Sequence, residues 1–284
     1  MNQEKSFLDS LKEHVVSGKA QLPAFDRTGL AIQEEMAKPD PDMQAIEKHI
    51  LRDPALTSQL LKMANSSFYR GMLEITTVRN AIVRLGLAEV SGLVTMLTQK
   101  KSFATQDPFI REYMDELWIH SVACALGAKW IAKECRLPSK MNEAFFAGLL
   151  HDIGKAFLLL AISDMKKSGE LGENVPRTFI EEALDSLHAA LGAQLLKAWN
   201  LPDVYCMVAR HHHDEDMQDR DVVLLMVSLA NKVLAKAGIG ITRTPDIDLA
   251  TSPEAIQLDL SEIKVAELEL TMEDYVAFIQ EGEA

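Results

Sequence analysis

The sequence has 284 residues, and 42 acidic against 29 basic side chains give it a formal net charge of −13 at pH 7. Its 48% hydrophobic and 25% charged residues are typical of a folded globular protein, and they exclude a chain that is disordered throughout. The negative charge argues against nucleic-acid and anionic-membrane partners, because both are bound through basic surfaces.

The first residues, MNQEKSFLDSLKEH, contain no apolar signal core, and every apolar run is interrupted before it reaches the roughly 18 residues of a membrane-spanning helix. We therefore expect a cytoplasmic protein without a membrane partner. The cysteines form no CxxC pair and lie in apolar helical stretches, which predicts small buried thiols without a redox or metal role. They are Cys124, Cys135 and Cys206.

Helical periodicity runs through nearly the whole chain, and no strand-like alternation of useful length interrupts it. Asp53 and Pro54 predict a helix start, because Asp caps free backbone N–H groups and Pro is tolerated at the first helical position. A second helix is expected from Thr76 to Leu85, where Gly86 ends it. The predicted fold class is all-α.

Pro-rich and polar breaks divide the chain at residues 38–42, 106–108 and 137–139, and again after Gly240. We expect an N-terminal helical lobe in residues 1–103, packed on a helical bundle in residues 104–240. Six of the eight histidines fall in that bundle. Residues 241–284 are predicted to form an acidic, partly helical C-terminal extension.

His151 and Asp152 form a doublet in the middle of an apolar helical stretch. Burying an ionised Asp costs roughly several kcal/mol unless the carboxylate is paired or coordinated. A metal ion that coordinates the carboxylate would remove this cost, so the doublet favours a metal site. The alternative is an Asp that caps a neighbouring helix beside a core histidine.

Further histidines follow the same helical pattern. Glu116 and His120 lie four residues apart, so both side chains can reach one point. His188 lies one step off an apolar stripe, and the run 211–213 ends another helix. Taken singly, His188 could be an interior histidine and the run a solvated helix end. Taken together, they predict a metal site built from facing helices.

The ordered set of His120, then His151-Asp152-Ile-Gly-Lys155, resembles the HD superfamily of metal-dependent phosphohydrolases over roughly residues 108–236. Trp199-Asn-Leu-Pro202 and the neighbouring histidines are similar to its HD-GYP branch of cyclic-di-GMP phosphodiesterases. The resemblance implies catalytic roles for Asp152 and for Lys155, whose cation could meet a phosphate. The alternative for Lys155 is a surface lysine. The implied metal ligands are Glu116, His120, His151, Asp152, His188, His212 and His213.

Residues 22–100 resemble the HDOD family, in which an HD-like bundle follows a family-specific helical lobe. The matching motifs are Leu22-Pro23, Ile50-x-x-Asp53-Pro54-Ala-Leu56, Leu60-Leu61-x-x-Ala64-Asn65-Ser66 and Ala81-Ile82-x-x-Leu85-Gly86. This resemblance implies a signalling or regulatory module, mostly of bacterial origin. On it, Asn65 and Ser66 are structural, because they can end a helix and bond local backbone.

The chain departs from the HD pattern in two places. Asn231 stands where the superfamily has its last metal-binding Asp, so this ligand carries no charge and should hold a divalent ion less tightly. No Gly-Tyr-Pro follows His213, which argues against hydrolysis of cyclic-di-GMP.

These observations lead to an HDOD-type signalling module that retains a metal-binding HD-like site and acts mainly by binding signalling proteins. The expected cofactor is one to three divalent ions of Fe, Mn, Ni or Zn. An alternative is an active metal-dependent phosphohydrolase that binds a nucleotide or other phosphoester. A third hypothesis is a metal-free scaffold with ordinary polar histidines.

Overall fold

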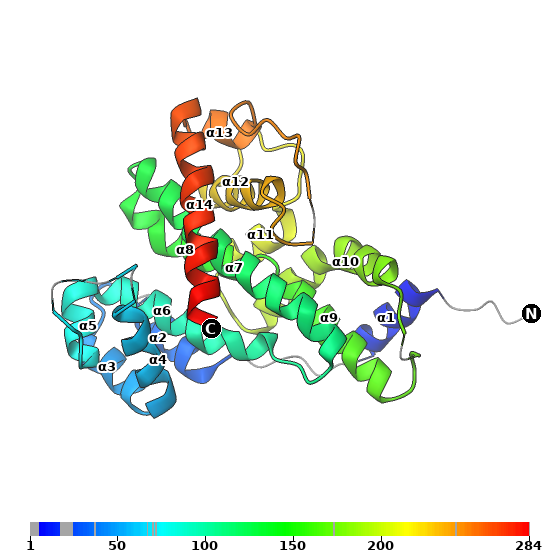
Figure 1. Cartoon of the computed structure of the whole chain (residues 1–284), viewed down its shortest axis with the longest axis horizontal. Helices are drawn as coiled ribbons and strands as arrows, with labels where there is room; N and C mark the ends of the chain where they lie inside the picture. Colours follow the sequence, from blue (N-terminus) through cyan, green and yellow to red (C-terminus); the bar gives the residue numbers. More distant parts are fainter. Residues whose placement is uncertain are drawn as a thin grey trace, which may run out of the picture. The chain divides into compact units, whose positions relative to one another are not determined.

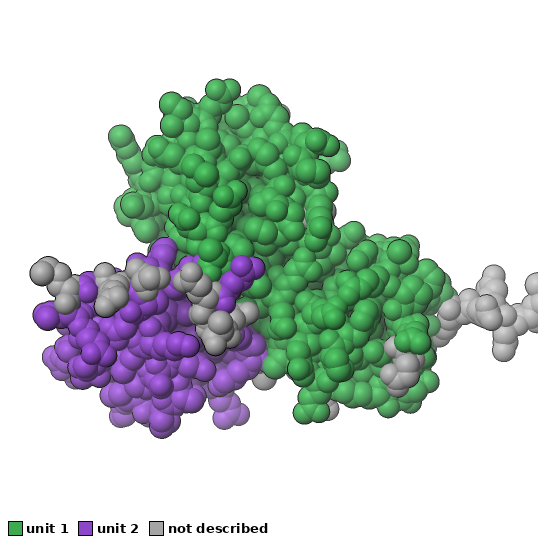
Figure 2. Space-filling model, viewed as in Figure 1, with its two compact units in different colours: residues 1–23, 103–277 green, residues 24–102, 278–284 purple. Residues whose placement is uncertain are grey.

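The computed structural model describes residues 6–17, 25–36, 38–66, 68–69, 71, 73–172, 174–241 and 243–283. These residues form helices and no strand, which confirms the all-α prediction (Figure 1). The chain divides into two compact units, coloured separately in Figure 2. Unit 1 comprises the described parts of residues 1–23 and 103–277, and unit 2 those of residues 24–102 and 278–284. The division of the sequence at residues 103 and 240 stays a prediction.

The helices of unit 2 begin and end where turn residues require it. The predicted start at Asp53 is confirmed: its Oδ1 accepts hydrogen bonds from the backbone N–H groups of Ala55 and Leu56, and Pro54 takes the first helical position. Gly86 ends the second predicted helix with φ of +91°, a left-handed conformation that favours glycine. The helices are α2 (Arg27–Met36), α3 (Met43–Leu51), α4 (Pro54–Ala64), α5 (Val78–Leu85) and α6 (Leu87–Gln99).

Asn65 and Ser66 are structural, as the HDOD resemblance implies. The Asn65 side chain donates to the carbonyls of Leu61 and Ile75 and accepts from the N–H of Ile75 at 2.7 Å. Ser66 donates to the carbonyl of Met63. These bonds join the end of α4 to the segment that precedes α5. The Leu22-Pro23 motif lies outside the described residues.

Unit 1 is arranged around the long helix α7, which packs against α8, α9 and α12. In turn, α10 packs against α9 and α11 (Figure 1). The helices are α1 (Phe7–Val16), α7 (Pro108–Glu134), α8 (Met141–Leu150), α9 (Ile153–Lys167), α10 (Arg177–Ala198), α11 (Asp203–His211), α12 (Val222–Lys236), α13 (Pro253–Gln257) and α14 (Glu262–Glu283), of which the residues from 278 on are assigned to unit 2. Short 3₁₀ helices occur at η1 (Lys100–Phe103) and η2 (Pro138–Lys140).

Two glycines bring the helices of unit 1 unusually close together. A Cβ on Gly148 of α8 would lie 2.8 Å from the Cα of Ala125 in α7. A Cβ on Gly154 of α9 would lie 2.1 Å from the carbonyl oxygen of His188 in α10. The second approach allows α10 to pass directly beside the start of α9, where the His151-Asp152 doublet lies.

The stretch Pro138–Lys167 is apolar and long enough to span a membrane by length and composition, but 94% of its most apolar 18-residue window is buried inside the structure. It therefore supplies core of unit 1. The prediction of buried thiols holds for Cys124 alone. Cys135 and Cys206 are partly exposed. Cys135 lies at the C-terminal cap of α7, where the helix ends.

Candidate metal centre

The His151-Asp152 doublet lies at the junction of two helices and not in the middle of one, so that part of the prediction is wrong. Helix α8 ends at Leu150 and α9 begins at Ile153. Asp152 occupies the N-cap position of α9, yet its side chain accepts no capping hydrogen bond. Its carboxylate is only 1% exposed. Asp152 is therefore a buried acid that does not serve as a helix cap.

Each oxygen of Asp152 meets a different pair of histidine rings. Oδ2 lies 3.5 Å from Nε2 of His120 and 3.4 Å from Nε2 of His151. Oδ1 lies 3.4 Å from Nε2 of both His188 and His212. Within each pair, the two Nε2 atoms are 3.3 Å apart. The junction before α9 thus gathers donor atoms from α7, α10 and the end of α11.

The separations within each triangle of donor atoms match a small metal ion. With metal–nitrogen bonds of about 2.1 Å, two corners of a tetrahedral site lie about 3.4 Å apart. Both triangles, one on each Asp152 oxygen, have sides of 3.3 to 3.5 Å. Each therefore has the size of one face of a tetrahedral coordination site.

Backbone carbonyls orient all four rings. Because a carbonyl oxygen only accepts, each Nδ1 carries a hydrogen, and every ring that is neutral turns the lone pair of its Nε2 toward Asp152. Lone pairs that face each other at this distance repel unless a cation lies between them. The Nδ1 partners are the carbonyls of Ile239 for His120, Gly148 for His151, Leu184 for His188 and Ala209 for His212, at 3.2, 2.7, 2.6 and 3.0 Å.

Burial sets the charges of the rings. Desolvation lowers the pKa of His120 to about 3 and that of both His188 and His212 to about 4, so these rings stay neutral, as metal ligands must. Desolvation also acts against the charged form of His151, but the Asp152 carboxylate outweighs it and raises the pKa of His151 to about 10. The His151 ring thus carries a second hydrogen, on Nε2, which it must release for that nitrogen to bind a metal ion.

Asp152 itself remains ionised in the interior. Burial alone would raise its pKa, but the positive charges of Lys155 and His151 hold that pKa well below the usual range of an Asp. Its Oδ1 is buried and accepts no hydrogen bond. A buried carboxylate oxygen without a hydrogen bond is costly. A divalent ion beside Oδ1 would satisfy it, so the residues present fit a metal.

The three histidines of residues 211–213 differ in position: two of them lie at the cluster and one does not. His212 is 2% exposed, so the interpretation of the run as a solvated helix end is wrong for this ring. His213 is more exposed, but a ligand atom of its ring lies within 4.8 Å of those of Asp152, His188 and His212. His211 points elsewhere and pairs with Asp214 at 2.9 Å.

Lys155 is an interior residue, so its interpretation as a surface lysine is wrong. Its side chain is 5% exposed, and its Nζ donates to Oδ2 of Asp152 at 2.7 Å. Its position one turn after Asp152 on α9 makes this contact local. The ammonium therefore shares an oxygen with the pair formed by His120 and His151.

Asn231 lies at the site, whereas Glu116 does not join it. A small, mostly enclosed cavity of about 10 Å³, enough for roughly one water molecule, adjoins the cluster. Glu116 departs from the expectation: its side chain is 41% exposed and lies 4.0 Å from Arg243. The carboxylate stays near solvent although it is one turn from His120. The cavity is lined by Leu117, His120, Asp152, Lys155, His213, Asn231, Gly240 and Ile241.

Gly240 is a part of the site that the sequence analysis did not identify. Its φ is +100°, and a Cβ there would lie 2.7 Å from Nδ1 of His120. The preceding residue, Ile239, supplies the carbonyl that this Nδ1 contacts. The segment after α12 thus orients the His120 ring. The sequence signal for such a contact is weak, because Gly240 is one of two glycines that follow the end of α12 at Lys236.

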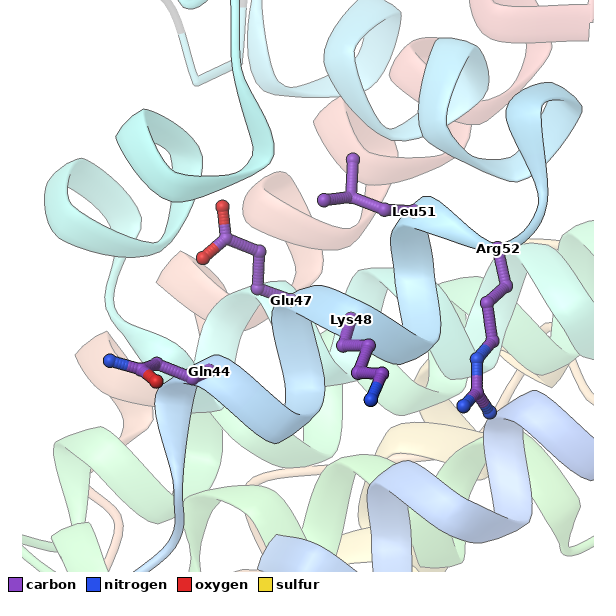
Figure 3. A pocket seen from close by; sticks show the side chains of 5 residues that line it. All are labelled: Gln44, Glu47, Lys48, Leu51 and Arg52. Carbon is purple, nitrogen blue, oxygen red and sulfur yellow. The ribbon is translucent and has the colours of Figure 1, made fainter.

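Larger hollows occur elsewhere, but their lining does not suggest a site. One of about 350 Å³ runs along α3, and Figure 3 shows that its side chains come from this helix and its C-terminal cap. These are Gln44, Glu47, Lys48, Leu51 and Arg52. Another, of about 500 Å³, lies at the start of α7, where Lys166 already pairs with Asp107 at 2.6 Å.

The family model of the HDOD domain matches residues 22–215, which is more than half of the chain. The chain belongs to the HDOD domain family. Among curated proteins, it is 25% identical to an uncharacterized protein of Treponema pallidum (strain Nichols) over 197 residues, which are 68% of this chain and 38% of that protein. It is 26% identical to Ribonuclease Y of Mesoplasma florum over 204 residues, or 72% and 33% of the two chains. The chain thus spans between 33% and 38% of the length of these relatives.

Solved structures share the fold of this HDOD chain. An HDOD domain protein of unknown function from Geobacter sulfurreducens superposes with a TM-score of 0.76 at 23% identity, over 97% of each chain. A Shewanella amazonensis SB2B protein, provisionally named a metal-dependent phosphohydrolase, gives 0.75 at 20% identity over 97% and 98%. A Marinobacter aquaeolei VT8 protein, provisionally named a signal transduction protein, gives 0.71 at 22% over 93% and 60%. At these identities the likeness establishes the HDOD fold alone.

Proposed function

We propose that this HDOD protein is a signalling or regulatory module that binds a divalent metal ion at its His/Asp cluster and acts mainly by binding signalling proteins. The ligands would be drawn from His120, His151, Asp152, His188, His212 and His213. The observation that carries the metal site is the buried Asp152 carboxylate, whose two oxygens each face two ring nitrogens at 3.4 to 3.5 Å. Imidazole-rich sites suit zinc, iron and nickel, and the carboxylate also suits manganese.

The surroundings of the cluster favour a regulatory over a catalytic role. Small-molecule sites are clefts of about 300–1,000 Å³, whereas the cavity beside Asp152 measures about 10 Å³. A nucleotide cannot enter a space of that size. Asn231 adds no negative charge there, and the Lys155 ammonium is already bonded to Asp152. These features support a metal that stabilises or signals rather than one that meets a substrate.

The second candidate is a metal-dependent phosphohydrolase acting on a nucleotide or other phosphoester, with Asp152 and Lys155 as catalytic residues. Its support is the set of five histidines around one Asp, together with a cation beside that Asp. When bound, a divalent ion in such a site supplies Lewis acidity toward phosphoryl oxygens and water. This candidate requires the α12–α13 segment around Gly240 to open and admit a substrate.

Metal analysis and a substrate screen separate these functions. Untagged protein from metal-replete cells is expected to carry about one equivalent of transition metal, and Asp152→Asn should carry far less. No phosphoester turnover is expected with Mn, Fe, Ni or Zn supplied. Turnover that Asp152→Asn abolishes would establish the hydrolase instead. Metal well below one equivalent, equal in both proteins, would contradict the metal site and leave the metal-free scaffold.

A further inference from the structure

The cluster consists of two half-sites that share Asp152. We define the His188 half-site as Asp152 Oδ1 with His188, His212 and His213, and the His120 half-site as Asp152 Oδ2 with His120 and His151. Within each half-site, the contributed ligand atoms lie within 4.8 Å of one another. The His188 half-site offers four ligands, enough for a tetrahedral ion, whereas the His120 half-site offers three.

Lys155 makes the two half-sites unequal. Its Nζ lies 2.7 Å from Oδ2, the oxygen of the His120 half-site, while Oδ1 of the His188 half-site accepts no hydrogen bond. The ammonium therefore occupies Oδ2, the one carboxylate oxygen that an ion bound by His120 and His151 would need as a ligand. The contact is as short as a strong charge-assisted hydrogen bond.

We infer that Lys155 serves as a built-in cation for the His120 half-site, so that the chain binds a single divalent ion, at the His188 half-site. Removal of the Lys155 charge would open the His120 half-site to a second ion. This inference rests on the proposed metal-binding function and specifies how many ions the site takes, which of its halves takes the ion and why.

Burial keeps Lys155 in that position. The residue is 4% exposed, and within the described chain the structure pairs its ammonium with Asp152 alone. Moving the ammonium away would leave a positive charge buried without a partner, which is strongly unfavourable. The other polar groups nearby offer no second carboxylate in this structure, because Asn231 is neutral and Glu116 lies near solvent beside Arg243.

The charge balance leads to the same conclusion. Asp152 is the single carboxylate among the residues of both half-sites and the adjoining cavity. Two divalent ions next to the Lys155 ammonium would place several positive charges against that one carboxylate in a buried setting. One ion at the His188 half-site, with Lys155 compensating Oδ2, leaves a much smaller excess.

The test is the stoichiometry of Zn²⁺ and Co²⁺ binding to the full chain, by isothermal titration calorimetry and by elemental analysis after desalting. The native protein and Lys155→Arg, which keeps the charge, should bind one ion. Lys155→Met, of similar length and no charge, should bind two, the second at least tenfold tighter than any second ion in the native protein. Lys166→Met is the matched control: it removes another buried lysine paired with an Asp, far along α9, and should leave one ion.

Single-ligand variants in the native Lys155 background locate the ion, even if Lys155→Met fails to fold. His120→Ala should keep the single ion, whereas His188→Ala should weaken it at least a hundredfold. Two ions in the native protein, or loss of the ion in His120→Ala but not in His188→Ala, would overturn the inference while metal binding itself stands. No ion in any variant would instead refute the proposed function.

Discussion

Asp107 and Asp152 are two aspartates in the same structural position with opposite surroundings. Each precedes a helix of unit 1 as its N-cap residue, and each bonds a buried lysine, Lys166 and Lys155. Asp107 Oδ1 also accepts from the N–H groups of Phe109 and Ile110, so its bonds are complete. Asp152 caps nothing, and its Oδ1 has no hydrogen bond.

This contrast separates a structural acid from a ligand-binding one. An Asp that caps a helix gains its hydrogen bonds from the local backbone and needs nothing further. An Asp that caps no helix, and whose Oδ1 faces the Nε2 atoms of the neutral His188 and His212 rings, still requires a cation beside that oxygen. The Asp-Lys pair alone therefore does not identify a site, whereas the accounting of each oxygen does.

The largest expected effect comes from removing the charge of each Asp in turn. Asp152→Asn should abolish metal binding and, because Lys155 stays buried without its partner, should lower the free energy of unfolding by about 3–5 kcal/mol. Asp107→Asn keeps an amide that can still cap α7, so it should cost about 1 kcal/mol and leave metal content unchanged. Urea unfolding in the presence of a chelator measures both. Equal losses of unfolding free energy in the two variants would contradict the distinction between a structural and a ligand-binding Asp.

The sequence predicts much of this arrangement, because its main signals are local. Helical periodicity, together with the Asp-Pro cap at Asp53, predicts helices that the structure confirms. Asp107 and Pro108, which the sequence marks only as a break, start α7 in the same way. The spacing of histidines in an all-helical region also predicts that distant rings meet near Asp152, and the structure brings five of them to it.

Other features depend on tertiary contacts that no local pattern records. The apolar periodicity continues through residues 149–155, so nothing in it predicts that the helix breaks at His151. The carbonyl that orients His120 comes from Ile239, a partner 119 residues away. The Glu116 carboxylate lies on the predicted helix, but its exposure depends on where the chain after α12 passes. The burial of Lys155 is a feature that the sequence could have predicted. Asp152 lies three residues before it, close enough on a helix to pair with its ammonium.

A second test of the contrast targets the close passage of α9 and α10, which brings His188 to Asp152. Gly154→Ala places a methyl carbon 2.1 Å from the carbonyl oxygen of His188, so the two helices must move apart. Overpacking of this kind costs about 1–3 kcal/mol, and we expect metal affinity to fall as well. Gly192→Ala, whose nearest contact is 3.2 Å, is the matched control and should lose less of both. Unchanged metal affinity in Gly154→Ala would mean that this approach does not position His188.

Asn65 extends the same contrast to unit 2, because its side-chain amide is partly buried and its hydrogen bonds are formed. Asn65→Ala removes three hydrogen bonds and leaves the N–H and carbonyl of Ile75 without this partner. The expected loss is about 2 kcal/mol in thermal or urea unfolding, with metal content unchanged. Asn65→Asp, which keeps an acceptor but loses the donor, should lose less. A fall in metal content would contradict a purely structural role.

The smallest expected effect is the pH dependence of the unfolding free energy that arises from Asp107 and its hydrogen bonds. Burial by itself raises the pKa of Asp107, but the bonds from Lys166 and from the backbone of Ile110 and Phe109 outweigh it, so the pKa is lowered. A carboxyl whose pKa is lower in the folded than in the unfolded chain stabilises the fold above its unfolded pKa, and that stability is lost as the pH falls through the folded value. The difference in unfolding free energy between the native chain and Asp107→Asn should therefore be constant, at about 1 kcal/mol, above about pH 5 and should shrink toward zero below about pH 4. Urea unfolding of both proteins across that range measures it. A difference that grows as the pH falls would mean that Asp107 is destabilised in the fold, and that its hydrogen bonds do not outweigh the cost of burial.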